Sequence, residues 1–365
     1  LYLNIECCFD FIISQFGPNI TIGPPLGLRK PVPLVNALYQ RVKNNPELSL
    51  TIFTALSLEK PSWTNELERR FFEPFVNRVF EGVPDLDYMH DIRNDAVPPN
   101  IRIHELYCKA GAYTKTPVMQ QNYMSTNYTH VVRDCMINGN RIYTNMLAKS
   151  ERNGARCYSA SCNADTTIAA LSEFRKARQR GEKRLTIGVV NSELPFMYGD
   201  AEIAPEEYDI IIDTGECDHK LFNTPRMPVA DPDYMIGLHA STLIRDGGTL
   251  QIGIGALGDA IAGALDMRQN RNDLYQKVIG DARIDETYAS LIEEIGGTGT
   301  FDTGLYGSTE MLVDAFLQLY KSGVIKRKVY HHIGIQKLLN KGLISEAVPR
   351  ETLRMMIEEE VLSFK

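Results

Sequence analysis

Residues 246–261 read DGGTLQIGIGALGDAI. The apolar segment 249–252 has the pattern of a short strand, the glycines at 253, 255 and 258 predict a tight turn, and helical apolar spacing follows. A glycine turn between a strand and a helix lets backbone N–H groups approach an anionic ligand at the positive end of the helix. The stretch therefore predicts a strand–loop–helix unit of an α/β protein.

The same alternation of short strands and amphipathic helices continues on both sides of this unit. Continuous apolar runs such as residues 185–190 are typical of strands that are buried in a parallel sheet. We expect two tandem open-sheet α/β domains. The expected helices are residues 34–44, a segment capped by Asp165 that ends at 181, and 233–246; the expected strands are 48–56, 129–133, 141–145, 185–190, 208–212 and 249–252; a second strand–helix unit is expected at 306–323.

A proline-punctuated polar stretch at residues 223–232 predicts a linker. It divides the chain into an N-terminal domain, 1–222, and the first part of a C-terminal domain, 223–365. Residues 266–304 are charged and end in a glycine cluster, which predicts a surface excursion inserted between the two strand–helix units. The helix that begins at 233 is expected to bury Ile236, Ala240, Leu243 and Ile244.

The composition excludes several classes of function. With 365 residues, 44% hydrophobic and 23% charged, the chain resembles an average globular protein and has no apolar run of about 18 residues, so no membrane association is expected. Its net charge of −7 and the lack of a long basic run argue against nucleic acid. Seven cysteines without a Cys-x-x-Cys spacing predict reduced thiols and a cytoplasmic location, and no histidine has metal-ligand spacing.

The glycine loop has three readings on its residues alone. A dinucleotide site also requires an acidic residue at the end of the next strand, about 20 residues on, and residues 268–277 are polar and not strand-like. A glycine turn that only packs a helix on a strand is the second reading. The third is a loop that holds an anionic ligand of another kind.

Three motifs give the chain a resemblance to a known family. Residues 246–261, the VNSELP segment at 190–195 with Gly199 and Asp200 after it, and GLYGSTEM at 304–311 resemble signatures of the acetyl-CoA hydrolase/CoA-transferase family, of the 4-hydroxybutyrate CoA-transferase-like, long-insert type. The resemblance implies two tandem CoA-transferase domains, the second of them truncated in this sequence. GPPLG at 23–27 resembles the N-terminal substrate loop of that family.

The resemblance also implies site residues. It points to Glu310 as the catalytic nucleophile. From its place one residue before the end of the strand, the amide of Gln251 could contact the acyl group or Glu310, or it could simply bond a neighbouring strand. Ser308 departs from the family, which commonly has histidine there. Expected substrate and CoA contacts are Gly253, Gly255, Ala256, Asn191 and Gly27.

The implied activity is acyl-CoA:carboxylate CoA transfer by ping-pong catalysis through a glutamyl-CoA thioester. The implied partners are acyl-CoA, as substrate rather than as a tightly bound cofactor, a small carboxylic acid and a second copy in a homodimer. No metal is expected. An acyl-CoA hydrolase that uses the same glutamate, and a catalytically degenerate CoA-binding protein, are the alternatives, the latter suggested by Ser308.

Overall fold

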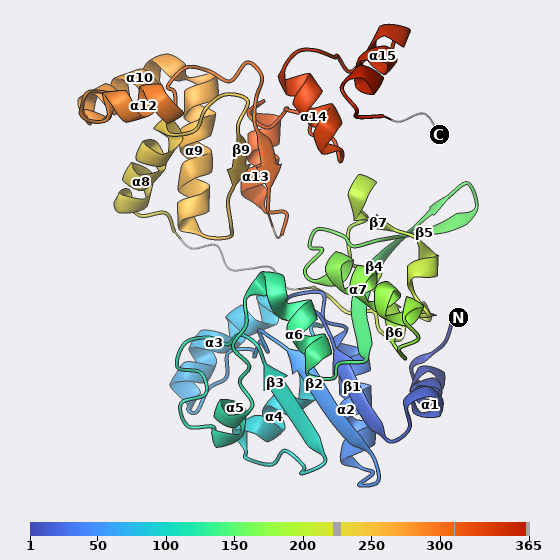
Figure 1. Cartoon of the computed structure of the whole chain (residues 1–365). Coiled ribbons are helices and arrows are strands. Elements are labelled where there is room, and N and C mark those ends of the chain that lie inside the picture. Colours follow the sequence, from blue (N-terminus) through green and yellow to red (C-terminus); the bar gives the residue numbers. More distant parts are fainter. Residues whose placement is uncertain (222–227, 310, 363–365) are drawn as a thin grey trace. The chain divides into compact units, whose positions relative to one another are not determined.

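The computed structural model describes residues 1–221, 228–309 and 311–362. The chain forms two compact units, Leu1–Pro225 and Arg226–Lys365, and both combine strands with helices (Figure 1). The expected fold class, tandem open-sheet α/β domains, is confirmed. Within the described residues no helix has the length and apolarity needed to cross a membrane. All seven cysteines are free thiols.

The first unit is built on a parallel sheet in the order β3–β2–β1–β4–β6–β8. The antiparallel strands β5 and β7 extend this sheet from the second half of β4. Its strands are β1 Asn19–Gly23, β2 Ser49–Thr54, β3 Ile101–Glu105, β4 Ile142–Arg152, β5 Ala155–Ser159, β6 Leu185–Val190, β7 Glu202–Ile203 and β8 Ile210–Ile212. Every residue of β6 and β8 is buried, as the continuous apolar runs predict.

The helices of the first unit pack their apolar faces on this sheet. In α2, Leu34, Val35, Leu38 and Val42 are buried at helical spacing, which confirms the helix expected there. The helices are α1 Ile5–Phe16, α2 Val32–Lys43, α3 Glu66–Val79, α4 Asp87–Arg93, α5 Pro117–Gln121, α6 Val131–Ile137 and α7 Thr167–Gln179, with 3-10 turns η1 Tyr128–His130, η2 Gly199–Ala201 and η3 Pro205–Glu207.

Two local predictions in this unit are wrong. Residues 129–133 were expected as a strand, but the segment forms η1 and the start of α6, because Val131 and Cys135 are four residues apart and are buried together on one helix face. Asp165 is not the cap of α7, whose preceding residue is Thr166. Asp165 instead has a left-handed backbone with φ of 46°, and its carboxylate accepts hydrogen bonds from the N–H groups of Gly27 and Thr166.

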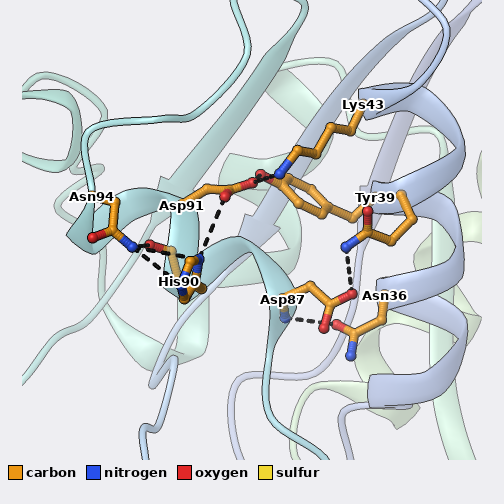
Figure 2. Close-up of polar contacts among 8 residues, drawn as sticks. Asn36, Tyr39, Lys43, Asp87, His90, Asp91 and Asn94 are labelled. Carbon is orange, nitrogen blue, oxygen red and sulfur yellow. Dashed lines mark hydrogen bonds and ion pairs between the residues drawn. The ribbon is translucent and has the colours of Figure 1, made fainter.

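A polar cluster joins α2 to α4 (Figure 2). The buried Asp91 carboxylate accepts hydrogen bonds from the Tyr39 hydroxyl and, at 2.5 Å, from Lys43 Nζ. His90 Nδ1 lies 3.7 Å from Asp91 Oδ1. Burial alone would raise the pKa of Asp91, but the bonds from Lys43 and Tyr39 lower it below its ordinary value. The cluster therefore fixes the helix that follows β1 and its loop.

The second unit has a two-stranded parallel sheet, β9 Thr249–Gln251 and β10 Tyr306–Ser308. Both strand–helix units predicted from the sequence are confirmed: α9 Ala256–Asn270 follows β9, and α13 Asp314–Lys321 follows β10. Their core includes Leu250, Leu265, Phe316 and Leu319. The remaining helices are α8 Asp231–Thr242, α10 Asn272–Asp281, α11 Ile284–Thr287, α12 Ala289–Ile295, α14 Ile333–Asn340 and α15 Arg350–Glu358.

Helix α8 buries a different face from the one that the sequence predicts. Ile236 is 49% exposed and Leu243 is 39% exposed, whereas Gly237, Leu238 and Ser241 are buried against α9. A Cβ at Gly237 would lie 2.7 Å from the carbonyl oxygen of Ala260. The small residue at 237 therefore lets the backbones of α8 and α9 approach closely. This close contact, rather than the apolar stripe through Ile236, decides which face of α8 is buried.

The inserted segment is part of the core rather than the surface excursion that we expected. Tyr275 and Ile279 of α10 are fully buried and pack with Leu238 of α8 and Ala264 of α9. The Tyr275 hydroxyl also shares a 2.8 Å hydrogen bond with Ser241. The charged residues that suggested a solvated loop occupy the outer faces of three short helices.

Candidate functional site

The ends of β9 and β10 form the first part of the candidate site. The two strands are parallel and Ser308 is in register with Gln251, so the segments that follow both strands leave from the same edge of the sheet. Gln251 and Ser308 are both exposed there. In open α/β sheets this carboxyl edge is where ligands bind.

In the glycine loop after β9, two positions require glycine and two positions have free space beside the backbone. Gly255 has φ of +135°, a conformation that side chains rarely adopt, and a Cβ at Gly258 would lie 2.5 Å from the carbonyl oxygen of Gly253. At Gly253 and Gly255 an added Cβ would meet no atom within 4 Å. The backbone at these two positions is therefore open to a ligand.

The helix that follows adds a favourable field. Helix α9 begins at Ala256. Its first helical hydrogen bond is the one that Asp259 N–H donates to Gly255 O at 3.2 Å, so the N–H groups before Asp259 in the first turn have no partner within the helix. The 15-residue helix directs its positive end at this loop. The arrangement suits an anionic group such as a phosphate, or an oxyanion that forms from a carbonyl.

The structure argues against the dinucleotide reading of this loop. That site needs a second strand after the loop helix, with an acidic residue at its end. Residues 272–281 form α10 instead, and this helix packs on α9. The glycine loop here thus lies in a strand–loop–helix unit that a second helix follows, unlike the unit of a dinucleotide-binding site.

Two charged residues to which the sequence analysis assigned no role, Asp246 and Arg268, brace the elements around this site. The Asp246 carboxylate accepts backbone N–H bonds of 2.8–3.0 Å from Gly247, Asp302, Thr303 and Gly304, immediately before β9 and β10. Burial raises the pKa of Asp246, but these donors outweigh it and lower the pKa below its ordinary value. The carboxylate thereby ties the two strands at their amino ends.

Arg268 of α9 is the second of these residues and is only 2% exposed. It donates to the carbonyl oxygens of Ser241 and Ile244 at 2.7 Å and of Gly299 at 2.6 Å, and its guanidinium lies 4.3 Å from the ring centroid of Phe301. It thus joins α8, α9 and the end of the insert. The only sequence signal was an arginine on a helix face that is otherwise alanine and leucine.

Glu310, the predicted nucleophile, lies outside the described residues. Its neighbours are described: the Thr309 hydroxyl donates to Met311 O at 2.8 Å. Gly307 of β10 packs under Phe316 of α13, where an added Cβ would lie 2.4 Å from the ring. Gly307 is therefore packed in the core of the second unit, and Thr309 and Met311, on either side of position 310, are joined by a hydrogen bond.

The structure brings together Gln251, Gly253, Gly255 and Ala256 within one strand–loop–helix segment. Asn191 and Gly27 belong to the first unit, where they follow the carboxyl ends of β6 and β1. Asn191 is fully buried, donates to His219 O at 3.1 Å and accepts from Glu193 N–H at 3.0 Å, so its amide is engaged by the protein. The Gly27 N–H donates to Asp165 Oδ2 at 2.9 Å.

Two buried cations, Arg29 and Lys30, lie in the β1–α2 loop, residues 24–31, and were not singled out from the sequence. Arg29 donates to Met146 O at 3.1 Å and to Asn163 O at 2.8 Å. Lys30 Nζ donates to Ala55 O at 3.0 Å. Burial lowers the pKa of Lys30 to about 8, against the opposing charges of Glu105 and Asp165. The signal in the sequence was an Arg-Lys pair directly after a glycine-proline loop.

Among the residues that the structure describes, no three His, Cys, Asp or Glu side chains are grouped so that they could hold a metal ion.

Comparison with known proteins supports the resemblance to CoA-transferases over part of the chain. No protein-family model matches the chain. Over 109 residues the chain is 32% identical to 4-hydroxybutyrate coenzyme A transferase from Clostridium kluyveri, which is 30% of this chain and 24% of that protein. Over 128 residues it is 29% identical to succinyl-CoA:cyclohexane-1-carboxylate CoA transferase from Geobacter metallireducens, which is 35% of this chain and 26% of that protein. The matched segments span about a quarter of each relative.

The solved structure of RipA from Yersinia pestis has a similar fold. It superposes with a TM-score of 0.53 and 18% identity over 89% of this chain and 59% of that chain. This likeness extends over both units of the chain and concerns the fold alone.

Proposed function

We propose that this chain carries out acyl-CoA:carboxylate CoA transfer at the carboxyl edge of β9 and β10. The observation that carries the proposal is the open backbone at Gly253 and Gly255, at the positive end of α9, on the edge where the segment after β10 also leaves the sheet. The partial similarity to two curated CoA-transferases supports the same chemistry.

The proposed nucleophile is Glu310, two residues after Ser308 in the sequence. Its carboxylate attacks the thioester carbonyl of an acyl-CoA, which gives an acyl-glutamyl anhydride and CoA thiolate. The thiolate then attacks the glutamyl carbonyl, which gives a glutamyl-CoA thioester and releases the acid. A second carboxylate reverses the two steps. Donors at the loop and the end of α9 would stabilise the oxyanion of each tetrahedral intermediate.

Hydrolysis of acyl-CoA is the second candidate, because water could replace the acceptor acid at the same glutamyl-CoA thioester. Ser308 and Gln251 are exposed at this edge, so polar side chains are available there to contact either an acceptor acid or a water molecule. Butyryl-CoA incubated with and without acetate separates the two reactions. Transfer predicts acetyl-CoA that forms only with acetate, whereas hydrolysis predicts free CoA thiol at a rate that does not depend on acetate.

The test variant for this assay is Glu310→Gln, and its matched control is Glu293→Gln, since Glu293 is an exposed glutamate of α12 in the second unit that is not part of the proposed machinery. Glu310→Gln is expected to abolish both products, and Glu293→Gln to leave them unchanged. Binding of CoA by the wild type without either product would support the catalytically degenerate alternative and contradict the proposal.

A further inference from the structure

We propose that helices α8 and α12 of the second unit form a docking surface for a basic amphipathic helix of a partner protein. Because α8 packs on α9 through Gly237, Leu238 and Ser241, the apolar stripe that its sequence displays stays outside the core. A contiguous apolar patch on a protein surface marks an interaction site. The docking surface contains neither the glycine loop nor Glu310, and it does not depend on the proposed CoA transfer.

Large apolar side chains from both helices form the docking surface. Each of them is 39–49% exposed, so a substantial part of its apolar area is open to a partner. Residues three, four or seven positions apart share one face of a helix, and this is the spacing from 236 to 243 and along 288, 291 and 295. The members are Met235 and Ile236 of α8, Leu243 directly after α8, Tyr288 directly before α12, and Leu291 and Ile295 of α12.

Two contacts join the halves of the docking surface. The rings of His239 of α8 and Tyr288 meet edge to face, with centroids 5.5 Å apart and an interplanar angle of 81°. At the other end, an added Cβ at Gly296 would lie 2.9 Å from Leu243 Cα, so the end of α12 lies directly against the end of α8. The apolar side chains therefore form one patch across α8 and α12, which Figure 1 shows in the second unit.

The charges around this patch are mostly of one sign. Helices α8, α11 and α12 contain no lysine or arginine. Arg283, directly before α11, pairs with Glu286 at 3.1 Å, and Arg245 donates a hydrogen bond to the backbone carbonyl of Glu294. The three helices carry six carboxylates, those of Asp231, Asp233, Asp285, Glu286, Glu293 and Glu294. The docking surface is thus apolar with an acidic border.

The acidic border decides which occupant fits the docking surface. A second copy of the chain would bring the same carboxylates to the interface from both sides, and like charges across an interface oppose association. Anionic lipid headgroups and the phosphates of nucleic acid are opposed for the same reason. A helix with apolar residues on one face and lysine or arginine beside them complements both the patch and its border.

The test uses two fluorescein-labelled synthetic peptides that share a leucine face. Each has about 18 residues, which is long enough for a helix. One peptide has lysine on its other face, and its matched control has glutamate there. Each is titrated with the full chain, and fluorescence anisotropy is measured in about 20 mM and about 0.5 M sodium chloride.

The variants replace exposed residues, so that they leave the core of the second unit intact. The test variants are Leu291→Ser and Glu294→Lys, both in α12. Leu317→Ser of α13 is the matched control for the first, since Leu317 is 48% exposed and Leu291 is 40% exposed. Glu358→Lys of α15, at another exposed glutamate, is the control for the second.

The lysine peptide is expected to bind in low salt with a Kd of about 1–50 μM, at least about tenfold more tightly than the glutamate peptide. Leu291→Ser is expected to weaken this binding about five- to tenfold, because less apolar area is buried. Glu294→Lys is expected to weaken it about tenfold in low salt and less in high salt, because salt screens exposed charges. The two control variants should stay within about twofold of the wild type. Hydrogen exchange of α8 and α12 should slow in the complex.

Equal affinity for the lysine and glutamate peptides would overturn the proposal, and so would equal effects of the test variants and their controls. Slower exchange confined to segments outside α8 and α12 would also overturn it. Sedimentation of the free chain tests a second copy as the occupant: a dimer that Leu291→Ser dissociates and Leu317→Ser does not would assign the surface to self-association instead. Binding to phosphatidylcholine vesicles that Leu291→Ser abolishes and Leu317→Ser does not would assign it to lipid.

Discussion

Replacing Gly237 by alanine is expected to destabilise the second unit, although alanine favours a helix more than glycine does. Gly237 lies inside α8, and the new Cβ would lie 2.7 Å from the Ala260 carbonyl oxygen and 2.8 Å from its carbon. Both are backbone atoms of α9 and cannot rotate away. The same change at Gly263 of α9 provides the control, because its Cβ would meet no atom within 4 Å.

The magnitude follows from two opposing terms. Alanine gains about 1 kcal/mol of helix propensity over glycine. Overpacking against fixed backbone costs about 1–3 kcal/mol, and contacts as short as those at Gly237 put the cost at the upper end. Gly237→Ala should therefore lose about 1–2 kcal/mol, whereas Gly263→Ala should gain about 0.5–1 kcal/mol. The two variants should differ by about 1.5–3 kcal/mol in the free energy of unfolding.

The assay must report on the second unit. The single tryptophan, Trp63, lies in the first unit, so its fluorescence follows that unit only. Native-state hydrogen exchange of peptides from α8 and α9 gives the opening free energy where the contact lies. An unchanged or increased opening free energy in Gly237→Ala would refute the close packing of α8 on α9 through this glycine.

Two further predictions concern buried charges. Asp91 has a lowered pKa in the folded state, so its contribution is complete above its unfolded value of about 4 and is lost as the pH falls through the lower folded value. Asp91→Asn should therefore lower the free energy of unfolding by about 1–3 kcal/mol at pH 7. Between pH 5 and pH 3, urea denaturation should show a smaller decrease in this free energy for Asp91→Asn than for the wild type. An equal decrease in both proteins would contradict the role of the Lys43 and Tyr39 bonds. Arg268→Met would remove the donor of three carbonyl oxygens, of which that of Ser241 is buried, and should lower the free energy of unfolding by about 2–3 kcal/mol in guanidinium denaturation. A loss below about 1 kcal/mol would exclude the bracing role.

Local periodicity was enough to predict much of the fold. Strand β6, helix α2 and both strand–helix units of the second unit were predicted because their residues form continuous apolar runs or single stripes. The prediction failed at α8, where packing depends on a small residue and leaves Ile236 exposed, and in the insert, whose polar sequence conceals a buried Tyr275. In both places the deciding contact is with a segment distant in the sequence.

The candidate site was only partly predictable for the same reason. The open backbone at Gly253 and Gly255 follows from the glycine pattern, which the sequence displays directly. The bracing by Asp246, and the bond from Gly27 to Asp165, join residues 56 or more positions apart, and an aspartate before a helix resembles an ordinary cap. Their roles depend on tertiary contacts that periodicity does not encode.

Intact-mass spectrometry with peptide mapping, after incubation with butyryl-CoA, tests the central claim most directly. The account predicts a CoA-sized adduct on the peptide that contains Glu310, lost in Glu310→Gln and retained in Glu293→Gln. Acetate should discharge the adduct and form acetyl-CoA. An adduct on another residue, or none with either butyryl-CoA or acetyl-CoA, would contradict covalent CoA transfer through Glu310.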